Sequence, residues 1–387
     1  MWPAVLLANC LLIEDWIVFM RIVYFSEAAI PSRSANSVHI MKMCSALAKQ
    51  GNEVFLLAPG YKKIEKYVGN LYEFYGVDKN FEVVKFNVPF RRGKGLFYIW
   101  QAGKYAKKLN PDLVMGRFFK GCFFCSLLGL KTVYEFHGPV DKKSDEHIFR
   151  GLAAVNRIDK MVVLSQRLQE HFIEKYNISA SKIIVAYNAA DALSRNEDYP
   201  VLKGEPGAFK VGFTGHLYSG KGMEIIEQLS RRMEGIEFHV IGGLPQDIEI
   251  WQQKLAECNN VFFYGYIPPS RVPYYRDLFD VLLLPVQEKV NVYGGNTFEQ
   301  PYSPPLKLFE YMESGRAIVA SNYLDEVLIN GETALLCNPA EITEWEEAIN
   351  YLYFNPQYKK KLGANARKEF FNYYTWAARA EKIINNW

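Results

Sequence analysis

The sequence predicts an α/β protein made of two parallel-sheet domains with a ligand-binding cleft between them. From Met20 onward, short apolar runs rich in β-branched residues alternate with amphipathic helical segments, which is the pattern of parallel α/β folds. The same alternation starts again after residue 204, and a chain of 387 residues is longer than one hydrophobic core usually serves. Two such halves favour a ligand at the carboxyl ends of the strands.

The first domain is expected over residues 20–204. Its strands are predicted at residues 21–26, 53–59, 81–88, 112–117, 131–138, 159–165 and 182–190. Amphipathic helices are predicted at 38–51 and around 98–109. The polar stretch NEDYPVLKGEPG, which contains proline and glycine, predicts the linker that closes this domain.

The second domain is expected over residues 205–365. Its strands are predicted at residues 209–215, 236–243, 261–267, 280–286, 317–321 and 333–338, and its helices at 222–233, 269–279, 303–315 and 342–352. A long loop at 287–302 precedes the third of these helices. Residues 366–387 predict a C-terminal helix that crosses back to the first domain.

Residues 1–19 do not continue the α/β pattern. Their apolar run is broken by Glu14 and Asp15, too early for the roughly 20 apolar residues of a spanning helix. No basic residue precedes the run, as a secretory signal would require. We expect an extension outside the fold, with Met20 as the true start; a short membrane-surface anchor is the less favoured alternative.

Composition excludes several classes of function. A chain with 49% hydrophobic and 22% charged residues is globular, and a net charge of +3 is too small for a nucleic-acid binder. Of six cysteines only Cys122 and Cys125 form a close pair, within an apolar run and without a second pair to complete a zinc site. We expect two buried cysteines on a helix, no metal, and a reducing, cytoplasmic compartment.

The first strand-to-helix turn argues against a dinucleotide enzyme. It lacks the pattern G-x-G-x-x-G, whose glycines let a pyrophosphate approach the following helix. The long loop at 27–36 is better suited to binding an acceptor, with Ser34 and Asn36 as candidate contacts.

The turn GHLYSGKG, residues 215–222, opens the second domain between a strand and a helix. Backbone N–H groups around Gly215, Gly220 and Gly222, together with the amino group of Lys221, are suited to binding phosphate. The turn departs from the P-loop G-x-x-x-x-G-K-[ST], because Gly222 stands where a hydroxyl would bind magnesium. Taken alone, a glycine-rich turn with a surface lysine is an equally good interpretation.

A second phosphate site is predicted at the helix that follows the long loop. Ser303 is a good N-cap and Pro304 a favoured first helical residue, so the N–H groups of Leu306 and Lys307 would be free at the positive end of the helix. One turn on, the carboxylate of Glu310 could accept hydrogen bonds from two ribose hydroxyls. The alternative is an exposed Glu310 paired with Lys307.

These residues resemble a known family. The segments FTGHLYSGKG, DVLLLPV, SPPLKLFEYMESGRAIVAS and GETALLCNP are similar to the donor domain of the retaining glycosyltransferases of family 4, which have the GT-B fold of two Rossmann-like domains. The run around Ser303 with Ser314 and Gly315 is the most specific part. RIVYFSE, LAKQGNEV and YEFHG extend the resemblance more weakly through the first half, so that it covers nearly the whole chain from Met20.

The resemblance implies roles for particular residues. Lys221 would neutralise the diphosphate of a nucleotide-sugar donor, Glu310 would bind its ribose, and His137 would lie beside the transferred sugar. A histidine that merely ends a core strand is the alternative for His137. The sugar would pass to a hydroxyl acceptor with retention, without cofactor or bound metal, because basic side chains and a helix N-terminus stabilise the leaving group.

The sequence departs from the family at two positions. His216 stands where many members have an arginine as a second diphosphate cation; Arg117 is a candidate replacement. Tyr302 stands where the family has an acid that contacts the donor sugar, and Glu299 is a candidate substitute. These changes keep two alternatives open: a non-catalytic nucleotide-sugar-binding subunit, and a nucleotide-sugar epimerase on the same fold.

The expected partners are a nucleotide sugar and a glycan or lipid-linked acceptor, as in the synthesis of bacterial surface polysaccharide, lipopolysaccharide or glycolipid. Basic residues are mixed with large aromatic ones over 90–100, and further lysines follow at Lys104, Lys107 and Lys108. This mixture suits the anionic inner face of a cell membrane. An ordinary solvated helix with a buried aromatic face is the slightly favoured alternative.

Overall fold

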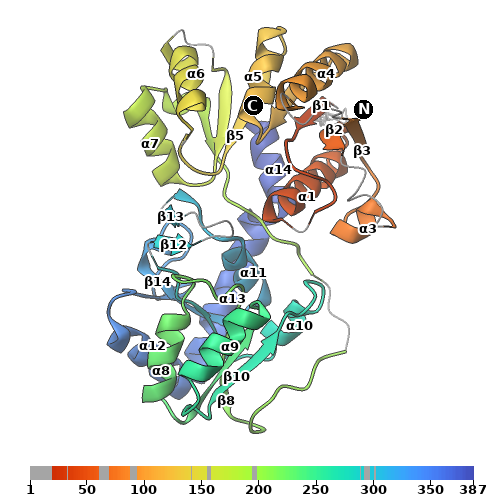
Figure 1. The fold of residues 1–387 in the computed structure, drawn as a ribbon. Helices are drawn as coiled ribbons and strands as arrows, with labels where there is room; N and C mark the ends of the chain where they lie inside the picture. Colours follow the sequence, from red (N-terminus) through yellow and green to blue (C-terminus); the bar gives the residue numbers. More distant parts are fainter. Residues whose placement is uncertain are drawn as a thin grey trace, which may run out of the picture. The chain divides into compact units, whose positions relative to one another are not determined.

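The computed structural model describes residues 20–32, 34–60, 69–87, 94–140, 142–154, 158–193, 198–287, 289–291, 297–299 and 302–387 (Figure 1). The chain divides into two compact units. The first holds the described residues up to Met115 together with Phe124–Lys131, and the second holds Gly116–Phe123 and Thr132–Trp387. The domain boundaries predicted from the sequence stay predictions, and residues 1–19 lie outside the described part of the chain.

The first sheet confirms the seven strands predicted for the first half. Its order is β3-β2-β1-β4-β5-β6-β7. In that order the strands are β3 (Glu82–Asn87), β2 (Glu53–Gly60), β1 (Arg21–Phe25), β4 (Leu113–Gly116), β5 (Thr132–Phe136), β6 (Lys160–Val163) and β7 (Ile183–Val185). β1 runs parallel to both β2 and β4, and β6 runs parallel to β5 and β7. Buried apolar strands of this kind are typical of parallel sheets covered by helices.

Helices alternate with these strands, as expected. They are α1 (Ala35–Lys49), α3 (Leu71–Tyr75), α4 (Lys94–Leu109), α5 (Phe119–Leu127), α6 (Lys143–Ala154) and α7 (Gln166–Tyr176). α1 begins earlier than predicted because Ser34 caps it: the hydroxyl accepts a hydrogen bond from the N–H of Ser37. Cys122 and Cys125 are both buried in α5, which confirms the structural interpretation of this pair. Burial raises the pKa of the Cys125 thiol to about 12, so it stays protonated.

The second sheet has six strands in the order β10-β9-β8-β11-β14-β15. In that order they are β10 (Val261–Gly265), β9 (Ile236–Ile241), β8 (Phe209–Thr214), β11 (Val281–Leu284), β14 (Ala317–Ser321) and β15 (Leu335–Cys337). Neighbouring strands are parallel throughout. The two sheets with their flanking helices form two Rossmann-like domains, as the sequence predicted.

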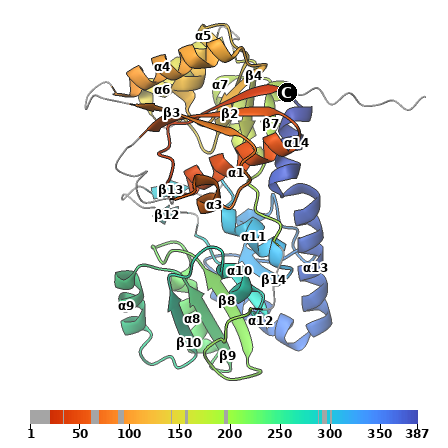
Figure 2. The same cartoon turned by 90° about the vertical axis from the view of Figure 1, so that its right-hand side faces the viewer.

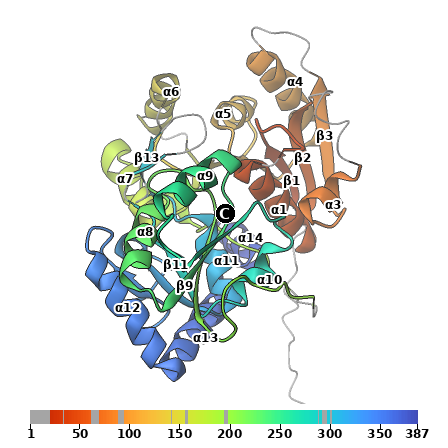
Figure 3. The same ribbon diagram turned by 60° about the horizontal axis from the view of Figure 1, so that its bottom comes forward.

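Side chains of the second sheet divide between two cores, because successive residues of a strand point to opposite faces. Leu283 packs with α8 (Met223–Arg232), α9 (Pro245–Lys254) and α12 (Ile342–Phe354), which cover one face (Figure 3). Its neighbours Leu282 and Leu284 pack instead with α11 (Leu306–Ser314) and α13 (Pro356–Tyr373). The alternation places α11 directly against the centre of the sheet.

Three local predictions need correction. The predicted loop 287–302 contains an antiparallel pair of short strands, β12 (Lys289–Asn291) and β13 (Thr297–Glu299). The helix predicted at 269–279 is only a short turn, α10 (Val272–Arg276). The C-terminal helix begins earlier than residue 366 and is two helices, α13 and α14 (Trp376–Asn385), because the hydroxyl of Thr375 caps a new helix by accepting from the N–H of Ala378 (Figure 2). Among the described residues, no helix is both long and apolar enough to cross a membrane.

Candidate active site

The predicted glycine-rich turn follows β8. Gly215 has φ 137° and Gly222 has φ 114°, values that residues other than glycine rarely adopt. Gly215 donates its N–H to the carbonyl of Ile241 at 2.8 Å, which ties the turn to the end of β9. A Cβ at Gly222 would collide with Pro285, so this position also needs glycine to let α8 start close to β11. Gly220, at φ 79°, completes the turn.

The pKa values of two side chains of this turn, Lys221 and His216, are lowered. Burial lowers the pKa of the Lys221 amino group, and none of the hydrogen bonds or ion pairs in the described residues engages that group. Burial first, and then the positive charges of Lys307 and Lys221, lower the pKa of His216, while Asp247 acts in the opposite sense. His216 is therefore neutral at pH 7, and its ring stacks on Tyr218 with centroids 5.0 Å apart.

The helix after the long loop begins at Leu306 and not at Pro304. Its N-cap is Pro305, with ψ 144°, and Ser303 lies two residues before the cap. The reason is the proline pair: a residue that precedes proline is disfavoured in the helical conformation, so Pro304 cannot start the helix. The N–H groups of Leu306 and Lys307 nevertheless occupy the first turn of α11, where they have no acceptor within the helix. The helix end therefore still presents free N–H groups, two residues further along than predicted.

The side chain of Lys307 is turned inward. Lys307 as a residue is only partly buried, but its Nζ atom is closed off from solvent and has no hydrogen-bond partner. Nζ lies 4.4 Å from the ring centroid of Phe213, and a Cβ at Gly215 would approach it to 2.5 Å. Burial, and then the nearby Lys221 cation, lower the pKa of Lys307 to about 7, against an opposing effect of Glu310. Sequence reasoning assigned Lys307 a backbone role only, because spacing does not reveal which way a long side chain turns.

Glu310 has a partner that the sequence did not predict. Its Oε2 accepts a hydrogen bond from the guanidinium of Arg276 at 2.5 Å, so the pairing of Glu310 with Lys307 considered above is wrong. Arg276 ends α10 and its side chain is only 3% exposed, whereas that of Glu310 is 43% exposed. The buried guanidinium therefore fixes the Glu310 carboxylate while leaving part of it open to solvent. No sequence signal distinguishes Arg276 from other arginines.

Residues of α7 and of the chain that follows β7 hold the segment that precedes α11. The hydroxyl of Ser165, the N-cap of α7, donates to the carbonyl of Tyr302 at 2.9 Å. The Tyr302 ring meets His171 edge-on, with centroids 5.3 Å apart. Asn188 donates to the carbonyl of Pro304 at 3.1 Å. Tyr302 thus has a packing role in addition to any contact with a ligand. Glu299 ends β13, and its side chain lies outside the described part of the chain.

His137 follows β5 and belongs to a buried polar cluster. Its Nε2 lies 2.8 Å from Oε1 of Glu135, and the same oxygen accepts a hydrogen bond from Arg379 of α14 at 2.9 Å. Both Glu135 and Arg379 are almost fully buried. A carboxylate at this distance orients the imidazole ring, and the guanidinium supplies its counter-charge. The two partners were not predicted from the sequence.

Three further predicted residues occupy other places. Ser34 is the N-cap of α1, and Asn36 lies in the first turn of that helix with its Oδ1 buried and without a partner. Arg117 directly follows β4 and is half-buried.

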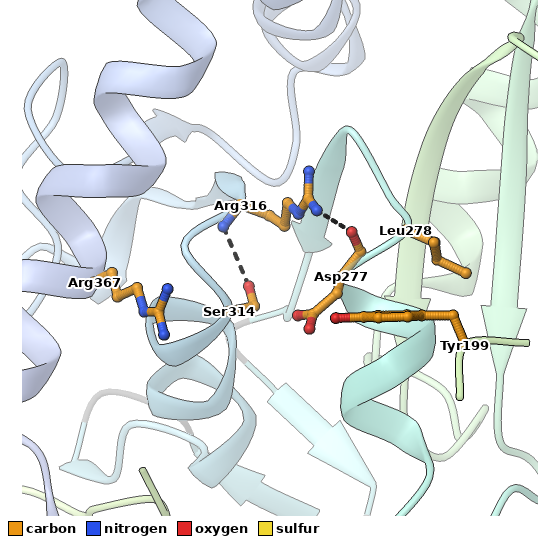
Figure 4. Close-up of a pocket in the computed structure, with 6 residues that line it drawn as sticks. All are labelled: Tyr199, Asp277, Leu278, Ser314, Arg316 and Arg367. Atoms are coloured by element: carbon orange, nitrogen blue, oxygen red, sulfur yellow. Dashed lines mark hydrogen bonds between the residues drawn. The ribbon is translucent and has the colours of Figure 1, made fainter. Parts of the chain in front are cut away.

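A pocket at the C-terminal end of α11 contains none of the predicted site residues. It is lined by Tyr199, Asp277, Leu278, Ser314, Arg316 and Arg367 (Figure 4). The guanidinium of Arg316 donates to the carbonyl of Asp277, and the backbone N–H of Arg316 donates to the Ser314 hydroxyl at 3.2 Å. Because Lys307 lies at the opposite end of α11, this pocket is separate from the predicted phosphate site.

Comparison with known families bears on both halves of the chain. The model of Glycosyltransferase Family 4 matches residues 37–192, and that of Glycosyl transferases group 1 matches residues 208–355. The chain belongs to the family 4/group 1 glycosyltransferases. The two matched ranges lie on either side of the predicted linker, and the second contains both the glycine-rich turn and α11.

Solved structures share the fold. Anabaena Alr3699/HepE, in complex with UDP, superposes with a TM-score of 0.71 at 16% identity, over 95% of this chain and 99% of that one. A variant of S. aureus TarM, in complex with fondaparinux, α-GlcNAc-glycerol and UDP, gives 0.68 at 12% identity over 95% and 99%. These likenesses confirm the GT-B fold.

A curated relative matches part of the chain. TuaH of Bacillus subtilis, a protein named for teichuronic acid biosynthesis, is 24% identical over 193 residues. The match covers 49% of this chain and 45% of TuaH, so the chain spans about half the length of that relative.

Proposed function

We propose that this glycosyltransferase-family protein moves a sugar from a nucleoside-diphosphate donor to a hydroxyl acceptor, with retention, in the synthesis of a bacterial surface glycan. The observation that carries the proposal is the pair of amino groups, on Lys221 and Lys307, that no carboxylate of the described residues neutralises. Lys307 lies in the first turn of α11, whose N–H groups have no acceptor within the helix. Lys221 lies in a turn whose Gly215 and Gly220 N–H groups are already hydrogen-bonded within the chain, so there its amino group supplies the attraction. Cations and N–H groups in this arrangement fit a diphosphate.

The nucleoside would be held next to the diphosphate. Glu310 lies one turn from the start of α11, and Arg276 fixes its carboxylate in a half-exposed position suited to two ribose hydroxyls. Complexes of HepE and of TarM with UDP support a uridine nucleotide as the first donor to test. HepE has also been solved with UDP-glucose.

The chemical step would rest on electrostatic stabilisation. As the bond between sugar and diphosphate breaks, negative charge grows on the β-phosphate, and preorganised cations lower the barrier most where charge develops. His137, oriented by Glu135, is the candidate for contact with the transferred sugar. In the retaining reaction we propose, a leaving phosphate oxygen takes the proton of the acceptor hydroxyl on the same face.

The test is turnover of a panel of nucleotide sugars by the purified protein. Thermal shift selects the donor first, because a ligand at a hundredfold excess over its Kd stabilises by roughly 2.7 kcal/mol. Release of UDP is then measured with and without glycan or lipid-linked acceptors. Acceptor-dependent release is expected. Donor binding without turnover would instead indicate a non-catalytic subunit, and isomerisation of the donor without acceptor would indicate an epimerase.

We further propose that the reaction needs no metal, because Lys221, Lys307 and the N-terminus of α11 supply positive charge at the leaving group. Excess chelator is expected to leave the rate of UDP release unchanged. A rate that falls with chelator and returns with magnesium or manganese would overturn this part of the proposal.

A peripheral contact with anionic membrane is the proposal for α4. Leu96 and Trp100 are exposed on this helix, and the amino group of Lys104 lies 4.4 Å from the Trp100 ring centroid. Arg91 and Arg92 lie outside the described residues. Each lysine near an anionic surface contributes about 1 kcal/mol, so Lys104→Gln with Lys107→Gln should weaken binding to anionic vesicles roughly thirtyfold. Co-sedimentation at two salt concentrations measures this; equal binding to neutral vesicles would contradict it.

A further inference from the structure

The amino group of Lys307 has no hydrogen-bond partner among the described residues. Its Nζ is closed off from solvent and has no hydrogen-bond partner; it lies over the Phe213 ring beside Gly215. A buried amine without a partner costs free energy, because it gives up its hydrogen bonds to water. A purely structural role would be served better by an apolar side chain such as methionine.

Charged groups around Lys307 do not neutralise it. Lys221 repels it, and the attractive Glu310 is already bound to the Arg276 guanidinium at 2.5 Å. His216, on the glycine-rich turn, is uncharged and stacks on Tyr218. Among the described residues, this cluster therefore has an excess of cationic groups and no carboxylate free to neutralise them.

We propose that Lys307 is the second cation of the donor-diphosphate site, and that the diphosphate itself is its counter-ion. This inference rests on the proposed function, since it assumes that a nucleoside diphosphate binds at the glycine-rich turn. Lys307 would supply the charge that the neutral His216 does not. The lysine stem is flexible, so its amino group can turn from Phe213 toward a phosphate that arrives at the first turn of α11.

A proton then accompanies the nucleotide. With a pKa of about 7 in the free protein, about nine-tenths of Lys307 is neutral at pH 8. A bound diphosphate favours the charged form, so binding at pH 8 takes up close to one proton. The sign follows by linkage: affinity for a diphosphate decreases as the pH rises above 7, by up to tenfold per pH unit.

Isothermal titration with UDP tests the proposal. Wild-type protein and Lys307→Met are titrated at pH 8 in HEPES and in Tris, whose different ionisation enthalpies reveal the number of protons taken up. The same UDP serves both proteins, so protons carried by the nucleotide cancel in the comparison. For Lys307→Met we expect a Kd weaker by about 10–100-fold, the range of one lost charge-assisted contact, and loss of the proton uptake. Uridine, which lacks phosphate, should bind both proteins alike.

Matched controls keep the outcomes apart. Lys360→Met removes an exposed lysine of α13 and should leave both Kd and proton uptake unchanged. Equal UDP affinity and equal proton uptake in wild type and Lys307→Met would overturn the role of Lys307 while leaving the proposed function intact. If neither UDP nor any other nucleoside diphosphate binds the wild type, the proposed function itself fails.

Stability of the free protein supplies an independent measurement. Because the pKa of Lys307 is depressed in the folded state, the folded protein binds fewer protons than the unfolded chain between about pH 7 and the ordinary lysine range. Wild-type stability should therefore rise with pH over this window relative to Lys307→Met. At pH 7 the variant should melt at the same temperature as wild type or higher. A lower melting temperature at every pH would assign Lys307 a structural role instead.

Discussion

Two polar clusters of this protein differ in how completely their buried groups are paired. At the end of β5, Glu135 accepts hydrogen bonds from His137 and from the buried Arg379, so each charge has its partner within the chain. Beside the end of β8, the Lys307 amino group has no hydrogen-bond partner, and none of the hydrogen bonds among the described residues engages the Lys221 amino group. Pairing of buried charges stabilises the fold and orients the side chains involved. In the unpaired cluster, we expect the amino groups to gain a partner when a ligand binds. In the first cluster the pairing holds His137 in position, whereas in the second the amino groups are left for a ligand.

Breaking the paired cluster should have the largest effect, and on stability. Glu135→Gln removes the carboxylate that pairs with the buried Arg379 guanidinium, which costs about 3–5 kcal/mol. Chemical denaturation of the variant measures the loss. The double variant Glu135→Gln with Arg379→Met, which removes both charges, should recover most of it. Full stability in the single variant would mean that the paired cluster does not support the fold, and the contrast between the clusters would not hold.

Breaking the unpaired cluster should affect turnover instead. Lys221→Ala is expected to lower kcat/KM for the donor on the order of 10²–10³, because a cation at the leaving group is lost. The free energy of unfolding should stay within experimental error, since Lys221 pairs with no carboxylate among the described residues. Lys360→Ala on α13 is the matched control. Near wild-type turnover of Lys221→Ala would remove the glycine-rich turn from the active site.

We expect the smallest effect at Arg276, whose pair with Glu310 combines features of the two clusters. Arg276 is buried like Arg379, but its partner Glu310 is half-exposed and faces the site. Arg276→Met frees the Glu310 carboxylate to move, so we expect KM for the nucleotide sugar to rise about tenfold with kcat nearly unchanged. Arg231→Met, which breaks an exposed pair on α8, serves as the control. A fall in kcat with unchanged KM would place Arg276 in the chemical step and not in positioning.

Much of the candidate site was predictable because it depends on short stretches of chain. Gly215 and Gly222 stand between a strand and a helix, where only positive φ values close the turn, and this is visible in the sequence. Lys221 is part of the same turn. Glu310 follows from helical spacing once the start of α11 is known approximately. The proline pair shifted that start to Leu306 without moving the N–H groups away from it.

Hydrophobic periodicity and glycine placement act over a few residues, so the sequence was enough to predict the two α/β domains, the strands of both sheets and the glycine-rich turn. Only the tertiary structure decided which side chains are neutralised. Glu135 and Arg379 are 244 residues apart in the chain, and Arg276 and Glu310 are 34 apart. Whether a buried charge finds a partner depends on packing between distant elements and on the exclusion of water there, and neither has a local signal in the sequence.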